Sequence, residues 1–151
     1  MLFRSGDGAS TLCPCGNNGG AGQGCANGTG SGAVLAATGS SSVALADLAL
    51  SASGLIPSQP GLYFQGNNAI SGGAGIQFGD GLRCAGGGVV RLQVRFASGT
   101  GTSATTADLI SLGGVVPGDT KRYQLWYRDP VLSPCGSLFN LTNGIERTFQ
   151  P

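Results

Sequence analysis

Glycine occupies 29 of the 151 positions, and this feature restricts most strongly how the chain can fold. A glycine inside a helix costs about 1 kcal/mol relative to alanine, and the share of glycine here is more than twice the usual value of roughly 7%. The glycines do not recur at every third position, as a collagen helix would need. Apolar residues make up 40% of the chain, which is enough to bury the core of one domain. The sequence therefore predicts a globular fold without helices of note.

Charge and composition exclude several classes of function. Only 10% of the residues are charged, the net charge is +1, and histidine is absent. A nucleic-acid-binding protein is usually strongly basic, so nucleic acid is not an expected partner. The chain therefore lacks the side chain that most often serves as a general base or a metal ligand, which is that of histidine. No apolar stretch reaches the roughly 18 residues of a membrane span, so none is expected.

Short apolar runs separated by turn residues predict the fold from residue 33 onward. Alternation of apolar and polar residues is clearest in residues 89–96 and 122–128, which is typical of half-buried antiparallel strands. Further strands are expected at residues 33–37, 43–51, 62–65, 74–78, 107–112, 137–142 and 145–149. Asn143-Gly144 predicts a tight hairpin turn between the last two. We therefore expect residues 33–151 to form an all-β antiparallel sandwich, jelly-roll-like or immunoglobulin-like, of about 8–10 strands.

The first 32 residues have a different composition. They are poor in apolar residues and rich in glycine, asparagine and serine, so they are expected to form a linker segment stapled by disulfides. Residues 1–5 lack the apolar core of a signal peptide and match the translated end of a sequencing adapter. We expect these five residues to be a non-native scar.

The five cysteines indicate an oxidising compartment. They are Cys13, Cys15, Cys25, Cys84 and Cys135. Zinc is the alternative, but the Cys-x-Cys spacing is tighter than that of usual zinc ligands. Disulfides are favoured, and Cys84 and Cys135, each in a glycine-flanked turn, can pair across the main domain. We expect no metal or other cofactor, since the Gly-Asp-Gly sequences lack the carboxylate density of a calcium loop.

Several stretches in fixed order resemble one family. They are Gly6-Asp7-Gly8, Cys13-Pro14-Cys15-Gly16-Asn17, Gly24-Cys25-Ala26-Asn27, Gly61-Leu62-Tyr63-Phe64-Gln65-Gly66, Phe78-Gly79-Asp80-Gly81-Leu82-Arg83-Cys84, Tyr123-Gln124-Leu125-Trp126-Tyr127-Arg128-Asp129 and Phe139-Asn140-Leu141-Thr142-Asn143-Gly144. Together they resemble an uncharacterised C-terminal β-sandwich module of large secreted proteins from environmental bacteria. The resemblance implies secretion and upstream domains in the same polypeptide, and it implies no activity.

One departure from the family pattern concerns the cysteines. The family places a further cysteine just before Gly6-Asp7-Gly8, about where Arg4 stands here. A lost sixth cysteine would explain the odd count, and the resemblance then implies that one cysteine of the N-terminal segment lacks a disulfide. We expect a Cys15–Cys25 disulfide and an orphaned Cys13.

The polar faces of the two clearest strands form a candidate ligand-binding surface. The residues are Arg91, Gln93, Arg95, Arg122, Gln124, Trp126 and Arg128. Sugar rings stack on aromatic plates, and arginine and glutamine supply hydrogen-bond donors, so acidic glycans would suit this face. The alternative is that Trp126 packs under a loop with arginine stems covering it.

No catalytic constellation is recognisable, and an enzyme is not expected. The seven carboxylates include Asp80 and Asp119, which lie in turn sequences where aspartate is favoured for structural reasons. We expect a secreted, monomeric, non-catalytic accessory module with a structural or surface-retention role at the cell surface or outside the cell. A carbohydrate-binding module and a secretion or sorting domain are the alternatives.

Overall fold

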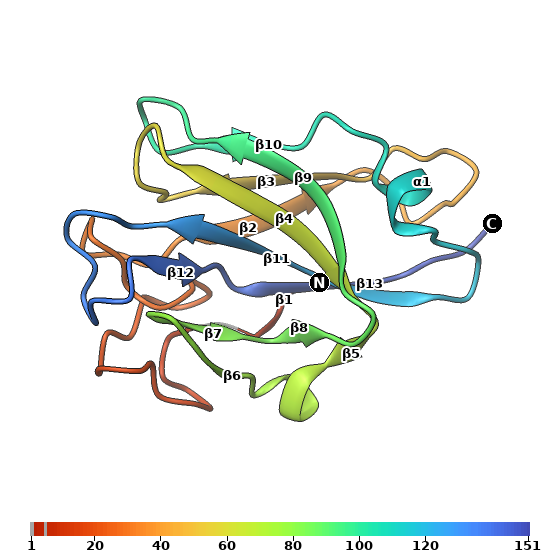
Figure 1. Cartoon of the computed structure of the whole chain (residues 1–151). Helices are drawn as coiled ribbons and strands as arrows, with labels where there is room; N and C mark the ends of the chain where they lie inside the picture. The colour runs from red at the N-terminus through yellow and green to blue at the C-terminus, as the bar shows by residue number, and fades with distance from the viewer. Residues whose placement is uncertain (1, 5) are drawn as a thin grey trace.

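The computed structural model describes residues 2–4 and 6–151, with side chains from residue 6 onward. The predicted scar, residues 1–5, therefore lies outside the part whose side chains are described. The fold is nearly all-β, and every pairing between strands is antiparallel, as predicted (Figure 1). The strands are β1 (Leu2–Arg4), β2 (Val34–Thr38), β3 (Ala49–Ser53), β4 (Pro60–Gly66), β5 (Asn68–Ala69), β6 (Ile76–Phe78), β7 (Gly81–Arg83), β8 (Ala85–Gly86), β9 (Val90–Phe96), β10 (Ser103–Ala104), β11 (Thr120–Arg128), β12 (Phe139–Leu141) and β13 (Gly144–Thr148).

Two sheets enclose the main core. The larger sheet has the order β1-β13-β11-β4-β9, with β12 beside the second half of β11, and the smaller has the order β10-β3-β2. Buried side chains of both sheets form one cluster, which includes Leu35, Leu50, Tyr63, Tyr123 and Leu125. The two-stranded pairs β5–β8 and β6–β7 lie on the other side of the larger sheet (Figure 1). There Phe64, Ala85 and Leu141 form a second small cluster.

Two of the predicted strands differ in the structure. Residues 107–112 are not a strand, because Asp108 caps a short helix, α1 (Leu109–Gly113), by accepting hydrogen bonds from the N–H groups of Ile110 and Ser111. The predicted strand at 43–51 is a strand only from Ala49 onward, and Ala46 has a φ of 49° in the turn before it.

Asn143-Gly144 does not form a hairpin turn. Strands β12 and β13 do not pair with each other in the structure but both pair with β11, so they follow it as one interrupted strand. Neither residue has a positive φ among the described backbone angles, so a type I′ turn is absent here. The side chain of Asn143 is buried against β2 instead.

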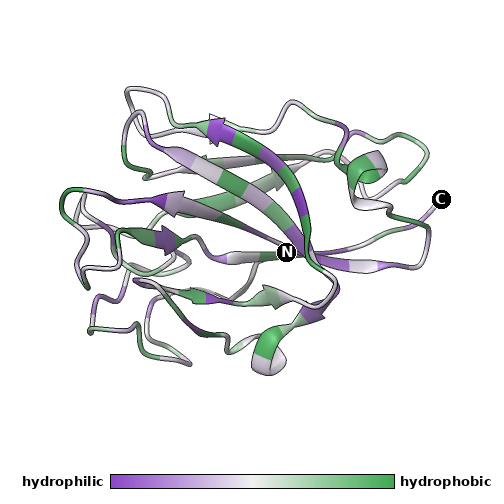
Figure 2. Cartoon of the chain, in the orientation of Figure 1, coloured by the Kyte–Doolittle hydropathy of each residue, from purple (hydrophilic) through white to green (hydrophobic). Residues whose placement is uncertain are grey.

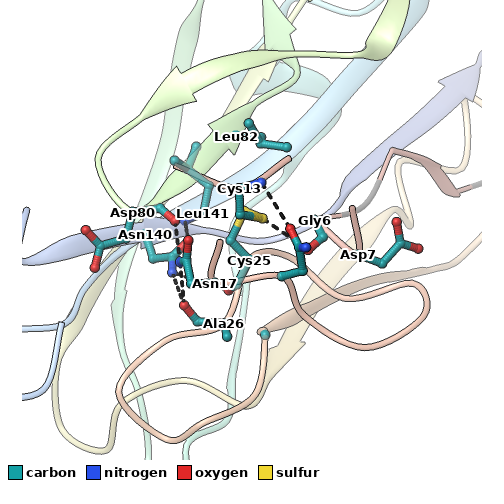
Figure 3. The surroundings of a disulfide bond; sticks show 12 residues. Gly6, Asp7, Cys13, Asn17, Cys25, Ala26, Asp80, Leu82, Asn140 and Leu141 are labelled. Carbon is teal, nitrogen blue, oxygen red and sulfur yellow. Dashed lines mark hydrogen bonds between the residues drawn. A yellow bond between two sulfur atoms is a disulfide. The ribbon is translucent and has the colours of Figure 1, made fainter. Parts of the chain in front are cut away.

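The N-terminal segment is stapled, as predicted, and it packs on the end of the larger sheet. The Cys13–Cys25 disulfide closes it, and Asn17 and Asn140 both donate to the carbonyl oxygen of Ala26, at 2.9 and 3.1 Å (Figure 3). The backbone approaches are close, because a Cβ added to Gly32 would lie 1.9 Å from the carbonyl oxygen of Gly24. Glycine is therefore needed here for space as well as for turns.

The predicted disulfide pairings were wrong. The disulfides are Cys13–Cys25 and Cys15–Cys135, so Cys13 is bonded and Cys84 lies outside both. The predicted bonds Cys15–Cys25 and Cys84–Cys135 do not form, although Cys15, Cys25 and Cys135 are disulfide-bonded as expected.

The position of Asp80 explains the long-range disulfide. Its backbone carbonyl accepts a hydrogen bond from Asn17, at 2.8 Å, and its buried carboxylate accepts one from the N–H of Cys135, at 3.3 Å. The two hydrogen bonds bring the segment of Cys15 beside the loop of Cys135. Cys84 is held elsewhere, because its N–H donates to the side chain of Gln124, at 2.8 Å.

Candidate ligand-binding face

The candidate site lies on the outer face of the larger sheet, which we define as the face turned away from β10-β3-β2. Trp126 of β11 is opposite Leu62 of β4, and Leu62 is opposite Val94 of β9. Side chains of directly opposed residues lie on the same face of an antiparallel sheet. These three residues therefore form a row across the middle of the outer face.

Arginines flank this row. Arg91 is opposite Phe64, which lies two residues after Leu62 in β4. Arg91 therefore projects from the outer face beside the row. Arg128 lies two residues after Trp126 in β11 and so projects on the same side. Figure 2 shows hydrophilic and hydrophobic residues alternating along β9.

A β-bulge between β4 and β9 places the predicted ligand-face residues of β9 on opposite faces of the sheet. The register shifts between Tyr63 and Phe64 of β4, so Gln93 is opposite Tyr63 and Arg95 is opposite Gly61. Tyr63 is fully buried in the main core, and Gln93 and Arg95 therefore lie on the side opposite Trp126. The placement of Gln93 and Arg95 on the ligand face was therefore wrong. The same alternation also predicted that Val94 and Phe96 lie on the buried face, but these side chains are 57% and 68% exposed.

Contacts on the inner side account for Gln93 and Arg95. The side-chain amide of Gln93 donates to Thr106 Oγ1, at 2.8 Å, and accepts from the N–H of Thr106, at 2.9 Å. Burial raises the pKa of Tyr63, while its hydrogen bond with Ser103 and the nearby charge of Arg95 act in the opposite direction.

Two other predicted site residues, Gln124 and Arg122, belong to the outer face, but their side chains are already hydrogen bonded within the protein. The side chain of Gln124 is fully buried and makes four hydrogen bonds, accepting from the N–H groups of Cys84 and Ala85 and donating to the carbonyls of Leu82 and Thr142. Arg122 donates through Nε to Glu146, at 2.8 Å, and through Nη1 to the carbonyl of Asn67, at 2.6 Å. Neither side chain is placed to bind a ligand. Of the seven predicted residues, Arg91, Trp126 and Arg128 remain together.

Two adjoining hollows open over this part of the face. The first has a volume of about 260 Å³ and is lined by residues that include Pro60, Leu62, Val94, Arg91, Trp126 and Arg128. The second has a volume of about 270 Å³ and is lined by residues that include Leu62, Phe64, Phe78, Arg83, Arg91 and Trp126. They share Leu62, Arg91 and Trp126, so they form one groove, which we call the outer groove.

The aromatic floor of the outer groove is fixed by packing. Trp126 contacts Phe78 and Phe139 edge-to-face, each with ring centroids 5.7 Å apart. Trp126 is thus partly packed, as the alternative interpretation proposed, yet it lines both hollows. Arg83 is the arginine that stacks on aromatic rings. Its guanidinium carbon lies 5.9 Å from the ring centroid of Phe64 and 5.8 Å from that of Phe78.

The outer groove is electropositive. None of the residues that line its two hollows is a carboxylate. Among the described residues the ion pairs are Lys121–Asp119 and Arg122–Glu146, so Arg91 and Arg128 have no ion-pair partner there. A groove with low-dielectric walls and charge of one sign concentrates its field on a ligand.

Arg83 and Val94 belong to the outer groove although they were absent from the predicted site. The alternation in β9 would have included Val94 only if the bulge were known, because the bulge moves every later side chain to the other face. Arg83 follows the turn at Gly79-Asp80-Gly81, and only the pairing of β6 with β7 brings it beside Phe78.

The buried carboxylates hold loops rather than facing the groove. Asp80 accepts hydrogen bonds from Ser133 Oγ and from the N–H groups of Cys135 and Ser137. Asp129 accepts from the N–H of Gly28, at 2.7 Å, and burial raises the pKa of its carboxyl group. In the described part of the chain, no group of three or more acidic or cysteine side chains is arranged to hold a metal ion.

None of the helices among the described residues is long and apolar enough to cross a membrane. Comparison of the chain with protein-family models, with curated proteins and with solved structures found no match.

Proposed function

We propose that this chain is a non-catalytic module of a larger secreted protein and that it retains this protein on a surface by binding a carbohydrate polymer in the outer groove. The observation that carries the proposal is the continuity of the two hollows across Leu62, Arg91 and Trp126. Each hollow alone is smaller than the roughly 300–1,000 Å³ of typical small-molecule sites, and both together fall within that range. A ligand that extends through both hollows suits a chain of sugar units better than one small molecule.

The chemistry of the groove suits sugars. The apolar side chains of Leu62 and Val94 beside the indole of Trp126 can take the C–H face of a sugar ring. Guanidinium groups at the borders can donate planar hydrogen bonds to ring substituents. The side chains of the floor are held by the sheet and by the contacts among Trp126, Phe78 and Phe139, so little conformational entropy would be lost on binding.

The disulfides support an extracellular location. Disulfides persist in oxidising compartments and are rare in the cytosol. The Cys15–Cys135 bond joins residues 120 positions apart and ties the glycine-rich segment to the domain. Such a staple is useful to a domain that must stay folded outside the cell.

The test is retention on a panel of insoluble and soluble polysaccharides, by pull-down and by affinity electrophoresis. Two variants reduce the groove, Trp126→Ala and Val94→Glu, and the second changes an exposed side chain that is not needed for packing. We expect the wild type to be retained by at least one polymer and both variants to lose retention. Failure of the wild type to bind any polymer, or unchanged retention of both variants, would overturn the proposal.

A further inference from the structure

We infer that the polymer is an anionic glycan and that Arg128, Arg91 and Arg83 bind its successive sulfate or carboxylate groups; this inference rests on the proposed function. The order of the three arginines follows from the hollows. Arg128 lines only the first, Arg83 only the second, and Arg91 lines both. The three guanidinium groups therefore follow one another along the outer groove, with Leu62 and Trp126 between them.

Two neighbouring arginines of this row are free to accept a ligand. Arg91 and Arg128 are exposed, and in the described part of the chain they form neither an ion pair nor a side-chain hydrogen bond. An anionic group would therefore gain charge-assisted hydrogen bonds without displacing an existing partner. Bidentate binding of planar carboxylate or of sulfate oxygens is the geometry for which guanidinium is best suited.

Arg83 is held in place before any ligand binds. Its Nε donates to the carbonyl oxygen of Ala85, at 3.2 Å, and its guanidinium lies over the rings of Phe64 and Phe78. These contacts leave the terminal nitrogens of Arg83 for the groove. An arginine fixed in this way loses less side-chain entropy on binding an anion.

The overall charge favours a glycan over nucleic acid. The net charge of the whole chain is only +1, whereas nucleic-acid-binding domains carry a broad excess of basic residues. In the groove, three arginines and no carboxylate lie beside apolar side chains that suit sugar rings. Nucleic acid is accordingly one of the outcomes that the experiment separates.

The experiment measures binding of the disulfide-bonded protein to two polymer pairs, and to single- and double-stranded DNA, by titration calorimetry. One pair is dextran and dextran sulfate, and the other is polygalacturonate and its methyl ester, so the two members of each pair share a sugar backbone and differ in whether it carries anionic groups. The variants are Arg91→Gln and Arg128→Gln, with Trp126→Ala to report on the groove itself. The matched control is Arg95→Gln, which removes an exposed arginine of the same strand that lies on the opposite face and lines neither hollow.

We expect the charged member of at least one pair to bind at least tenfold more tightly than its neutral partner. Loss of one charge-assisted contact corresponds to a factor of roughly 10 to 100, so Arg91→Gln and Arg128→Gln should each weaken binding by at least about tenfold. Arg95→Gln should change affinity by less than about twofold, and salt dependence should fall in the two groove variants alone. Binding restricted to the sulfated polymer or to the uronate supports the inference and identifies the anion.

Three results would overturn the inference. Equal binding of charged and neutral polymers that still depends on Trp126 would leave the proposed function standing and remove the anionic ligand. An equal loss in Arg95→Gln and Arg91→Gln would show general charge attraction instead of a site. Tighter binding of single- or double-stranded DNA than of any polysaccharide would assign the groove to nucleic acid. Absence of binding to all neutral and charged polymers would instead contradict the proposed function itself.

Discussion

The side-chain amide of Asn143 is hydrogen bonded to both backbone groups of Leu35. Its Oδ1 accepts from the N–H of Leu35, at 2.7 Å, and its Nδ2 donates to the Leu35 carbonyl, at 3.0 Å. Leu35 belongs to β2, the end strand of the smaller sheet, and Asn143 lies between β12 and β13 of the larger one. One side chain thus substitutes for a neighbouring strand and links the two sheets at a buried position.

Replacement of Asn143 by alanine is expected to lower the free energy of unfolding by about 2–5 kcal/mol. The change leaves a buried N–H and a buried carbonyl without partners, and each costs about 1–3 kcal/mol. Asn143→Asp keeps the acceptor and loses the donor, so it tests the two bonds separately. Urea unfolding monitored by tryptophan fluorescence measures both. A loss below about 0.5 kcal/mol in Asn143→Ala would show that water replaces the amide.

Hydrogen bonds from buried polar side chains also explain which parts of the fold could not be predicted from the sequence. The all-β antiparallel class and the inward face of β11 could be predicted, because Tyr123, Leu125 and Tyr127 alternate with polar residues and all three are buried. Asn143-Gly144 has the sequence of a hairpin turn, yet its tertiary hydrogen bonds to Leu35 decide its conformation. No local pattern reports such a contact between residues 108 positions apart.

The candidate site could be predicted in part for a related reason. β11 follows strict alternation over its length, so Trp126 and Arg128 were placed on the correct face. β9 contains a bulge beside Phe64, and a single inserted residue reverses the facing of residues 93–96. Disulfide pairing failed similarly, because Cys15 meets Cys135 only through the hydrogen bonds of Asn17 and Asp80.

Loss of the Cys15–Cys135 disulfide is expected to destabilise the fold by up to about 5 kcal/mol. The bond closes a loop with a sequence separation of 120, and the chain-entropy model gives about that value for long loops. Cys15 is exposed, so little packing is lost with it. Cys15→Ala, Cys135→Ala and the double variant should therefore have the same stability, since each lacks the same bond. Peptide mapping without reduction should recover Cys15 linked to Cys135; a peptide that links Cys84 to Cys135 would contradict the structure.

Substitution of Gly32 by alanine is expected to cost at least about 3 kcal/mol or to prevent folding. Its Cβ would lie 1.9 Å from the carbonyl oxygen of Gly24, and a backbone atom cannot move aside as a flexible side chain can. Gly99→Ala is the matched control, because a Cβ there meets nothing within 4 Å and the φ is not positive. Its stability should stay unchanged or rise by up to about 1 kcal/mol. Equal thermal midpoints of the two variants would refute the close packing of the N-terminal segment.

Asp129 is expected to make the protein less stable as the pH rises. Burial raises the pKa of its carboxyl group in the folded state above the ordinary value of 3.8, the charge of Asp80 acts in the same direction, and the hydrogen bond from Gly28 opposes both. Above pH 3.8 and up to the raised pKa, the folded state therefore binds more protons at this site than the unfolded state does. The linkage relation then requires the free energy of unfolding to fall through this window.

Asp129→Asn isolates this effect, because asparagine keeps an acceptor for the N–H of Gly28 and does not titrate. The stability of the variant relative to the wild type should increase as the pH is raised from about 4 to about 7. The comparison is Asp119→Asn, since the hydrogen bond from Val116 and then the contact with Lys121 lower the pKa of Asp119. That variant should lose stability relative to the wild type as the pH rises through 3.8, because the wild type gains a favourable carboxylate there. Urea unfolding of the three proteins from about pH 2.5 to about pH 7 measures both slopes, because the Asp119 window lies below pH 3.8 and the Asp129 window lies above it. The same sign for the two variants would show that the carboxyl group of Asp129 is not held in a desolvated site.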